Sequence, residues 1–573
     1  MQIKFIVIFI VAFISVAATS AQDSVFNRVV TVERDYQPEI QQANKIPVTP
    51  NFIKEEVEPN PVVYSTYSIP LVVDFNLHPL QAAKTDFTPQ TPLNGIIEGG
   101  IGHRNSHLLF GYQIASAKHT ALNLYASHDA YWGRDALSQS LLGMQLVHHF
   151  RNMDMYFDVK GNNDYFTYYG KYFDGNQGLA INIGEPVEHQ NLWQVSANVG
   201  VKSTHKGDVQ YSFQVGYKAC IAPQYTVENQ ILTHFDINWT SNKKHVAGIN
   251  IDVQNMLYNT LKPDSTILNR HALRIEPFYE YKHKSIRLHA GVNVDLNIGT
   301  GTLLSSVENI AFAPSPNIEF EWNMMDNVFH LYANAKGSIG IGSVEEYLGY
   351  NRYLDINQGV AFNDIRAYTP VDAQIGFKIR PVKTMLIDIY GGYAYHIGAC
   401  HMEAILQDNS PGVQEYKLWL HNEQQWKVGA NLHYHYKDII DVNLAGNYYF
   451  YPLGRIPSMD PTSPNFLKAT TTFDRPQWDA YARIDAHIDS KWSIYSENQF
   501  VGSRLAYVMK SPGGASAEKL RPIISLNIGG QYSINKWLNV YLQLNNYLNR
   551  KNDIFYGYQS QGCHFLLGVK YKF

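Results

Sequence analysis

Histidine, cysteine and methionine side chains offer the first candidates for chemistry. His433 and His435 lie two residues apart, so on a strand they share a face and could share a metal ion. Cys400, His401 and Met402 form a second, softer set of ligands. No third ligand for the histidine pair is identifiable, so we interpret it as polar lining and predict neither a metal site nor a cofactor.

Catalysis requires a more specific pattern than this sequence contains. Acyl transfer needs a nucleophile such as Ser beside a His, but the 22 histidines allow many such pairs and no spacing selects one. Cys220, Cys400 and Cys563 are odd in number and far apart, which predicts neither a disulfide framework nor a CxxC metal pair. We therefore predict that the protein is not an enzyme.

A dense run of aromatic residues is the candidate for ligand or partner contact. Aromatic rings stack on sugars and on the surfaces of protein partners. The same rings could instead belong to an aromatic girdle at a membrane interface, or pack within their own loop. The run consists of Tyr165, Phe166, Tyr168, Tyr169, Tyr172 and Phe173.

Composition restricts the class of protein that can position these residues. The chain has 573 residues, of which 45% are hydrophobic and only 17% are charged, so it is too apolar for disorder. Lys and Arg total 46 against 50 Asp and Glu. Because a nucleic-acid-binding protein normally carries a basic excess, we predict no nucleic-acid partner.

Residues 1–21 have the pattern of an export signal peptide. Lys4 is followed by a largely apolar run to Ala18 and by a small-residue cleavage site that ends at Ala21. No cysteine follows the cleavage site, which disfavours a lipid anchor. Beyond Ala21 no run approaches the ~18 consecutive apolar residues that a membrane-spanning helix needs. A membrane β-barrel does not need such a run, because it crosses the membrane with strands.

Residues 22–94 differ in composition from the rest of the chain. They contain nine of the 25 prolines, which disfavours a sheet interior and predicts an extended periplasmic or luminal segment. Within it, a short β-branched stretch could be a contact strand for a periplasmic energy-coupling protein, or an ordinary extended segment. This stretch is Val29, Val30, Thr31, Val32 and Glu33.

Residues 95–573 alternate between apolar and polar side chains over segments of roughly ten residues, the period of a strand with two different faces. For example, Val195 and Val199 fall on one face, and Gln194 and Asn198 on the other. Ten short polar turns alternate with longer connections, including 164–190, 341–369, 452–474, 503–521 and 549–560. We therefore predict an all-β fold: a transmembrane antiparallel up-and-down β-barrel of about 22 strands, with its short turns in the periplasm.

The last strand carries a pattern that looks like the C-terminal recognition signal of bacterial outer-membrane proteins. Alternate apolar positions end at an aromatic C-terminal residue, and these positions are Phe565, Leu567, Val569, Tyr571 and Phe573. This pattern predicts location in the cell outer membrane, with the barrel assembly machinery and outer-membrane lipid as partners.

Two stretches resemble TonB-dependent receptors, particularly those of Bacteroidetes-type bacteria. Residues 544–551, 556–558 and 565–573 resemble the closing hairpin of that family, and residues 344–348 with 351–354 are similar to a recurring loop of its barrels. The resemblance implies a 22-stranded barrel that mediates uptake or passage of a solute. It also implies a periplasmic energy-coupling protein or a surface lipoprotein as partners.

The sequence departs from that family before its first strand. The family carries a large N-terminal plug inside the barrel, whereas only 73 residues, Gln22 to Asn94, precede the first strand here. Because a 22-stranded lumen is wide, it needs a filler: the proline-rich segment, inward-folded loops or a partner protein. Two functions follow as alternatives, solute transport and a non-transporting scaffold of a multi-protein outer-membrane complex.

Overall fold

The computed structural model describes most of the chain from Asn94 to the C-terminus. The predicted signal peptide, the contact strand at residues 29–33 and all but the last residue of the proline-rich segment lie outside the described residues. The described ranges are 94–116, 119–133, 135–174, 178–179, 187–204, 207–222, 226–260, 269–300, 310–325, 328–340, 342–355, 368–407, 412–452, 473–511 and 514–573.

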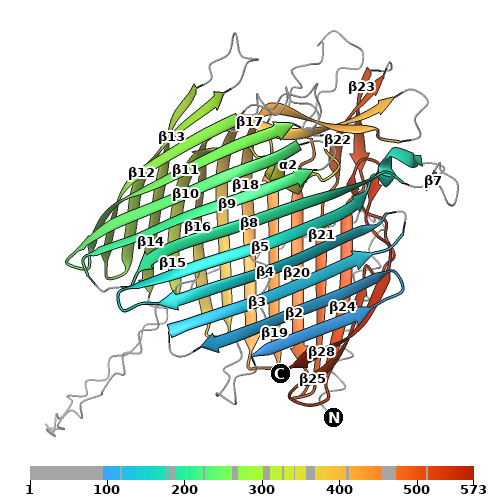
Figure 1. The fold of residues 1–573 in the computed structure, drawn as a ribbon, viewed down its shortest axis with the longest axis horizontal. Coiled ribbons are helices and arrows are strands. Elements are labelled where there is room, and N and C mark those ends of the chain that lie inside the picture. The colour runs from blue at the N-terminus through green and yellow to red at the C-terminus, as the bar shows by residue number, and fades with distance from the viewer. Residues whose placement is uncertain are drawn as a thin grey trace, which may run out of the picture. The chain divides into compact units, whose positions relative to one another are not determined.

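A closed antiparallel barrel of 22 strands forms the body of the protein, as predicted from the alternation (Figure 1). The first half of the ring is β1 (Gly95–Ile101), β2 (Asn105–Ser116), β3 (Thr120–Tyr131), β4 (Leu137–His149), β5 (Met153–Thr167), β8 (His189–Ser203), β9 (Val209–Ala222), β10 (Thr226–Ser241), β11 (His245–Thr260), β12 (Asn269–His283) and β13 (Ile286–Thr300). The second half is β14 (Ile310–Met325), β15 (Phe329–Ile339), β16 (Tyr368–Val382), β17 (Met385–Gln407), β18 (Glu415–Tyr436), β19 (Ile440–Phe450), β20 (Trp478–His487), β21 (Trp492–Val501), β24 (Ile523–Ser533), β25 (Leu538–Asn545) and β28 (His564–Lys572).

The seam of the barrel joins its first and last strands. β1 pairs with β28 from Ile96 opposite Lys572 to Ile101 opposite Leu567. The terminal residue extends this ladder: Gly95 N donates to Phe573 O at 2.8 Å, and Phe573 N donates to Gly95 O at 2.9 Å. A Cβ atom at Gly95 would lie 2.3 Å from the Phe573 ring, so the missing side chain lets the terminal ring lie across the seam.

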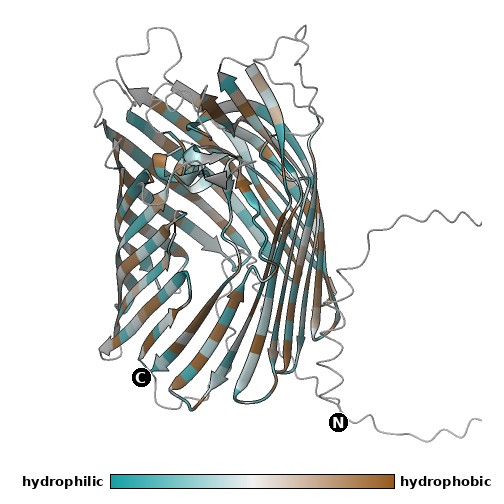
Figure 2. Cartoon of the chain, turned by 90° about the vertical axis from the view of Figure 1, so that its right-hand side faces the viewer, coloured by the Kyte–Doolittle hydropathy of each residue, from teal (hydrophilic) through white to brown (hydrophobic). Residues whose placement is uncertain are grey.

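The outer face of the barrel is apolar. On β8, Trp193, Val195 and Val199 point outward and are exposed by 47%, 42% and 47%. The five residues of the predicted C-terminal signal, four on β28 and the terminal Phe573, all point outward and are exposed. Figure 2 shows the resulting alternation of hydrophobic and hydrophilic bands along the strands. Such a surface is stable in lipid, where a barrel satisfies all of its backbone hydrogen bonds internally.

The inner face carries charged and amide side chains that pair with one another across strands. Arg287 on β13 contacts Glu280, Glu319 and Glu321 at 2.7, 3.1 and 3.0 Å. On the opposite half of the ring, Arg483 contacts Glu497 at 2.8 Å. Unlike a soluble domain, the barrel therefore turns its polar face inward and its apolar face outward.

The ten short connections that the sequence predicted all lie at one rim of the barrel. They join β2 to β3, β4 to β5, β8 to β9, β10 to β11, β12 to β13, β14 to β15, β16 to β17, β18 to β19, β20 to β21 and β24 to β25. In the β10–β11 turn, Asn242 and Lys243 have φ values of 51° and 55°, a left-handed conformation that asparagine tolerates better than most residues. The long connections lie at the opposite rim, which is the extracellular rim in barrels of this type.

The connection predicted over residues 503–521 contains a hairpin. It consists of β22 (Arg504–Ser511) and β23 (Gly514–Leu520), and β22 pairs in parallel with Glu403–Gln407 of β17. This pairing is available because β17 continues past Ile397, where its ladder with β16 ends. The short elements η2 (Tyr169–Tyr172), β6 (Phe173–Asp174), β7 (Gly178–Leu179), α2 (Val344–Tyr350), β26 (Asp553–Phe555) and β27 (Tyr558–Gln559) also lie in the long connections. None of the described helices is long and apolar enough to cross a membrane.

Substitutions at two neighbouring residues of β8 test which face of the barrel lies in lipid and which faces the lumen. Val199 points outward between Phe157 and Val215 of the adjacent strands, near the middle of β8. Arginine there should destabilise the barrel by about 2–4 kcal/mol, because its charge would be buried in lipid. Asn198→Arg should be tolerated, since Asn198 faces the lumen and donates to Asp158 Oδ1 at 3.5 Å. Denaturant unfolding in lipid vesicles measures both changes, and an equal loss in the two variants would contradict the assigned faces.

Candidate functional site

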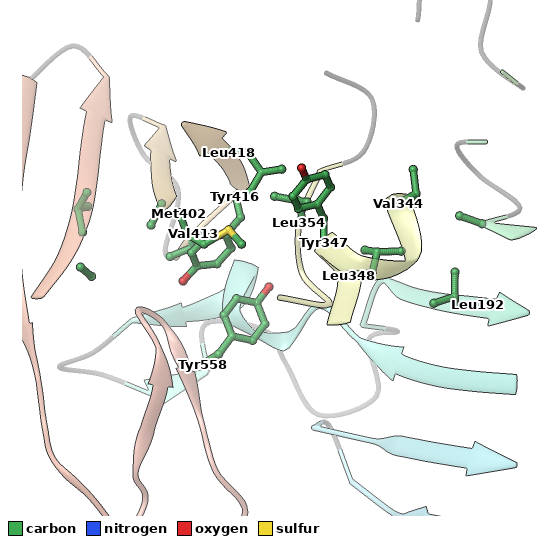
Figure 3. Packing of buried hydrophobic residues seen from close by; sticks show 14 of the residues in the cluster. Leu192, Val344, Tyr347, Leu348, Leu354, Met402, Val413, Tyr416, Leu418 and Tyr558 are labelled. Carbon is green, nitrogen blue, oxygen red and sulfur yellow. The ribbon is translucent and has the colours of Figure 1, made fainter. Parts of the chain in front are cut away.

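Five of the long connections and the adjoining wall bury a common apolar cluster at the extracellular mouth of the barrel, which we name the mouth core (Figure 3). The wall contributes Leu192, Cys220 and Ala222 from the luminal faces of β8 and β9. The connections and strand ends contribute Val344, Tyr347, Leu348, Leu354, Met402, Ala404, Val413, Tyr416, Leu418, Ala506, Val508, Leu520 and Tyr558, with Tyr169 packed against them. Inward-folded loops therefore occupy the mouth.

Helix α2 is the central element of the mouth core, and Figure 1 shows it within the upper end of the ring of strands. The Ser343 side chain caps the helix by accepting a hydrogen bond from Glu346 N at 3.0 Å. Seven residues are too few for a stable isolated helix, so its stability must come from packing. Val344, Tyr347 and Leu348 supply this packing, since all three are buried.

A buried carboxylate on the barrel wall holds the start of α2. Glu228 points inward from β10, is completely buried, and accepts a hydrogen bond from Val344 N at 2.6 Å. Gln230, two residues along the same strand, donates to Glu228 at 2.6 Å. At the edge of the same contact, Lys218 of β9 lies 3.5 Å from Glu345.

Hydrogen bonds join the connections to one another as well as to the wall. Leu354 forms a parallel bridge with Tyr416, and Asp355 N donates to Tyr416 O at 3.0 Å. Val413 N donates to Gly170 O at 3.1 Å, which links the β17–β18 connection to the β5–β8 connection. Because each connection completes another's hydrogen bonds, the mouth core is one interlocked unit.

A second set of bonds fixes the last connection, between β25 and β28. Arg521 pairs with Asp553 through two contacts of 2.9 and 2.7 Å, and Arg504 donates to Ile554 O at 2.9 Å. Burial raises the pKa of the Asp553 carboxyl, but hydrogen bonds from Arg521 outweigh it and hold the pKa below its usual value. Asp553 is therefore charged at neutral pH and anchors this connection to the β22–β23 hairpin.

Stacked tyrosines lie at the centre of the mouth core. The rings of Tyr353 and Tyr558 are 3.6 Å apart at an interplanar angle of 20°. Tyr169 meets Tyr558 edge-on at 5.0 Å and donates its hydroxyl to Gln559 O at 2.5 Å. Burial raises the pKa of Tyr353 to about 12, so its hydroxyl stays protonated at physiological pH.

The predicted aromatic run leads into this cluster. Phe166 and Tyr168 are buried, and both rings meet Tyr353 edge-on at 5.8 and 6.3 Å. Tyr165 instead packs against His189 at 5.3 Å. The structure therefore places much of the run in packing within the mouth, while contact with a ligand or partner stays a prediction. Tyr172 lies in η2 and Phe173 in β6.

The histidine pair lies on the luminal face of β18, close to the periplasmic rim. His433 Nε2 and His435 Nδ1 each lie 3.2 Å from the same oxygen of Asp441. Met402, from the second candidate set, packs in the mouth core, whereas the buried His401 lies 3.3 Å from Glu423. Among the described residues, no group of three or more His, Cys, Asp or Glu side chains could hold a metal ion.

Sequence reasoning missed the residues that connect the loops to the wall. In the sequence, Glu228 is one polar residue among many at luminal positions of the alternation, and nothing in its neighbourhood distinguishes it. The available local signal was Ser343 followed three residues later by Glu346, a capping pattern that marks the start of a helix.

Comparison with solved structures shows the same barrel fold. The FrpB iron transporter from Neisseria meningitidis is 11% identical, with a TM-score of 0.63 over 84% of this chain and 82% of that chain. The copper transporter OprC is 11% identical, with a TM-score of 0.61 over 84% and 81%. The ferric-catecholate import receptor Fiu from E. coli K12 is 11% identical, with a TM-score of 0.58 over 85% and 82%.

The chain matches no family model and no curated protein. The solved structures confirm, at the level of the fold, the resemblance to TonB-dependent receptors that the sequence predicted. The shared fold is the large β-barrel, which has 22 strands in this chain.

Substitution of Glu228 tests the contact between wall and helix. Glu228→Ala removes the acceptor of the Val344 amide, which should destabilise α2 locally by about 1.5–3 kcal/mol. Hydrogen exchange of the amides of residues 344–347 should then accelerate by roughly 10- to 100-fold, while the barrel strands keep their protection. Glu228→Gln keeps an acceptor oxygen and should have a smaller effect. Unchanged exchange in Glu228→Ala would show that the carboxylate does not hold the helix.

Proposed function

We propose that this protein is an outer-membrane receptor that takes up a solute through its barrel, with the mouth core as the gate. The observation that carries the proposal is the combination of a 22-stranded ring with a separate, interlocked core of loops in its mouth. A ring of this size exceeds what its own inward side chains can fill. A protein that only needed a membrane anchor would be served by a much smaller barrel.

The inner wall below the mouth suits the passage of a hydrophilic solute. Many of its charges are paired across strands, as for Arg287 with Glu280 and Arg483 with Glu497. Paired charges and amides offer hydrogen bonds without one strongly attractive ion site that would trap a charged solute. Iron, copper and ferric catecholates are named as the solutes of the similar proteins. Our proposal does not assign any of them to this protein.

Opening of the gate requires that contacts between loops and wall break. Glu228 with Val344 and Lys218 with Glu345 are the contacts where α2 meets β9 and β10. We propose that a periplasmic energy-coupling protein binds residues 29–33 and supplies the energy that breaks these contacts. The barrel fold and the β-branched character of that stretch support this partner.

The scaffold function is the second candidate, and a specific observation favours it. The connections in the mouth satisfy one another's hydrogen bonds, as Leu354 does with Tyr416 and Val413 with Gly170. A mouth that is held this firmly also suits a barrel that carries a partner rather than a solute.

Solute depletion from the growth medium separates the two functions. We expect that cells lacking the gene remove at least one small hydrophilic solute from a defined medium more slowly than cells with the intact gene. A variant that lacks residues 29–33 should show the same defect while its barrel still assembles, as judged by heat-modifiable migration in SDS gels.

Purification in mild detergent provides the complementary measurement. A lone barrel, together with a depletion defect, supports uptake. Equal depletion of every solute in both strains, together with a stoichiometric partner, would contradict uptake and support the scaffold.

A further inference from the structure

A hollow of about 260 Å³ opens from the inner wall beside the seam, toward the extracellular end of the barrel. It forms where the wall is incomplete, because β1 ends at Ile101 while β28 continues three residues further, to His564. On the β2–β4 side its lining includes Asn105, His107, Asp129, Tyr131 and Gln139, and on the β25–β28 side Gln543, Asn545 and His564.

The turn between β1 and β2 packs against β28 at this place. The rings of His103 and Phe565 stack at 5.1 Å, and Phe565 belongs to the outward, lipid-facing side of β28. A Cβ atom at Gly102 would lie 1.7 Å from Phe565 O, so only glycine allows the turn to come this close. The hollow is therefore walled off on the lipid side.

Two residues that line the hollow each carry a buried polar atom without a hydrogen-bond partner among the described residues: Tyr131 Oη and Asn105 Oδ1. Tyr131 is only 8% exposed, and its ring is fixed by Arg104 at 5.0 Å on one side and by His564 edge-on at 5.3 Å. Leaving a buried hydroxyl unpaired is unfavourable, so a water or ligand molecule that reached it would gain a hydrogen bond.

The charges around the hollow are already paired. His107 lies 2.6 Å from Asp129, while Glu98, 3.8 Å from His107, contacts Lys570 at 3.3 Å. Arg104, behind Tyr131, pairs with Asp135 at 2.9 Å. Because each of these charged groups already has a partner among the described residues, the hollow offers little attraction to an ion.

The uncharged lining instead suits a molecule that both donates and accepts hydrogen bonds. Gln139, Gln543 and Asn545 each carry an amide with both capacities, and the Tyr131 hydroxyl adds a further donor and acceptor. We propose that this hollow binds a neutral polyhydroxylated unit, of the size of one sugar ring, on its way through the mouth. This inference rests on the proposed uptake function and names the class of its solute.

The volume is consistent with that size. A hollow of about 260 Å³ has room for several water molecules, which a ring with its hydroxyl groups can replace. A larger saccharide would place one unit in the hollow and extend into the lumen.

Binding to the purified, full-length barrel in detergent tests the inference without requiring transport. The probes are glucose, galactose, mannose and N-acetylglucosamine, with galacturonate as the charged counterpart, measured by saturation-transfer NMR. We expect at least one neutral sugar to bind, and to bind more tightly than galacturonate. Tyr131→Phe should weaken that binding roughly three- to tenfold, as should Gln543→Leu, because each removes hydrogen bonds to a neutral ligand.

Tyr131→Phe should fold normally, since the lost hydroxyl has no partner among the described residues. The matched control is Gln531→Leu, a luminal amide on β24 opposite Tyr541, outside the hollow and toward the periplasmic rim. Its affinity should equal that of the unmodified protein. Absence of binding by every neutral sugar, equal affinity in all variants, or preference for galacturonate would each overturn the inference. A depletion defect without sugar binding would leave the uptake function standing and remove only this assignment.

Discussion

Closure of the strand ladder is the constraint on which the rest of the structure depends. In lipid an unpaired strand edge would leave backbone groups without partners at a cost of several kcal/mol each, so the first and last strands must meet. They do so from Gly95 opposite Phe573 to Ile101 opposite Leu567. Closure fixes the outward direction of one residue in two on every strand, and so separates a lipid-facing surface from a polar lumen. The up-and-down strand order places all the long connections at one rim, and closure arranges them in a ring where they can contact one another.

The wide lumen that closure creates explains the mouth core. Each connection alone has little apolar surface to bury, and α2, with seven residues, would not be helical by itself. Packed together over Leu192 and Cys220 of the wall, the connections bury Tyr347, Tyr416 and Tyr558 almost completely. Stability is therefore shared among distant segments, and release of one contact, such as Glu228 with Val344, weakens the others. That property suits a gate.

The barrel was predictable from sequence because its signal is local and repeated. Alternation along single strands, such as Val195 and Val199 against Gln194 and Asn198, located all ten short turns and the strand number. The mouth core was not predictable, because its contacts join residues hundreds of positions apart, as Tyr169 joins Gln559. The hairpin over residues 504–520 was likewise hidden, since it depends on the free edge of β17. Glu228 and Tyr131 occupy ordinary luminal positions in the pattern. Only the fold shows that Glu228 holds a helix and that the Tyr131 hydroxyl has no hydrogen-bond partner among the described residues.

Conductance across planar bilayers tests most directly whether the interlocked loops close the mouth. The comparison is between the full-length protein and a variant in which residues 343–354, with α2, are replaced by a short Gly-Ser linker. Heat-modifiable migration confirms that both barrels are folded. If the loops are the gate, the intact protein conducts little and the variant opens in large, stable steps, because removing α2 takes away the centre of the mouth core. Equal conductance of the two proteins would contradict this account of the mouth.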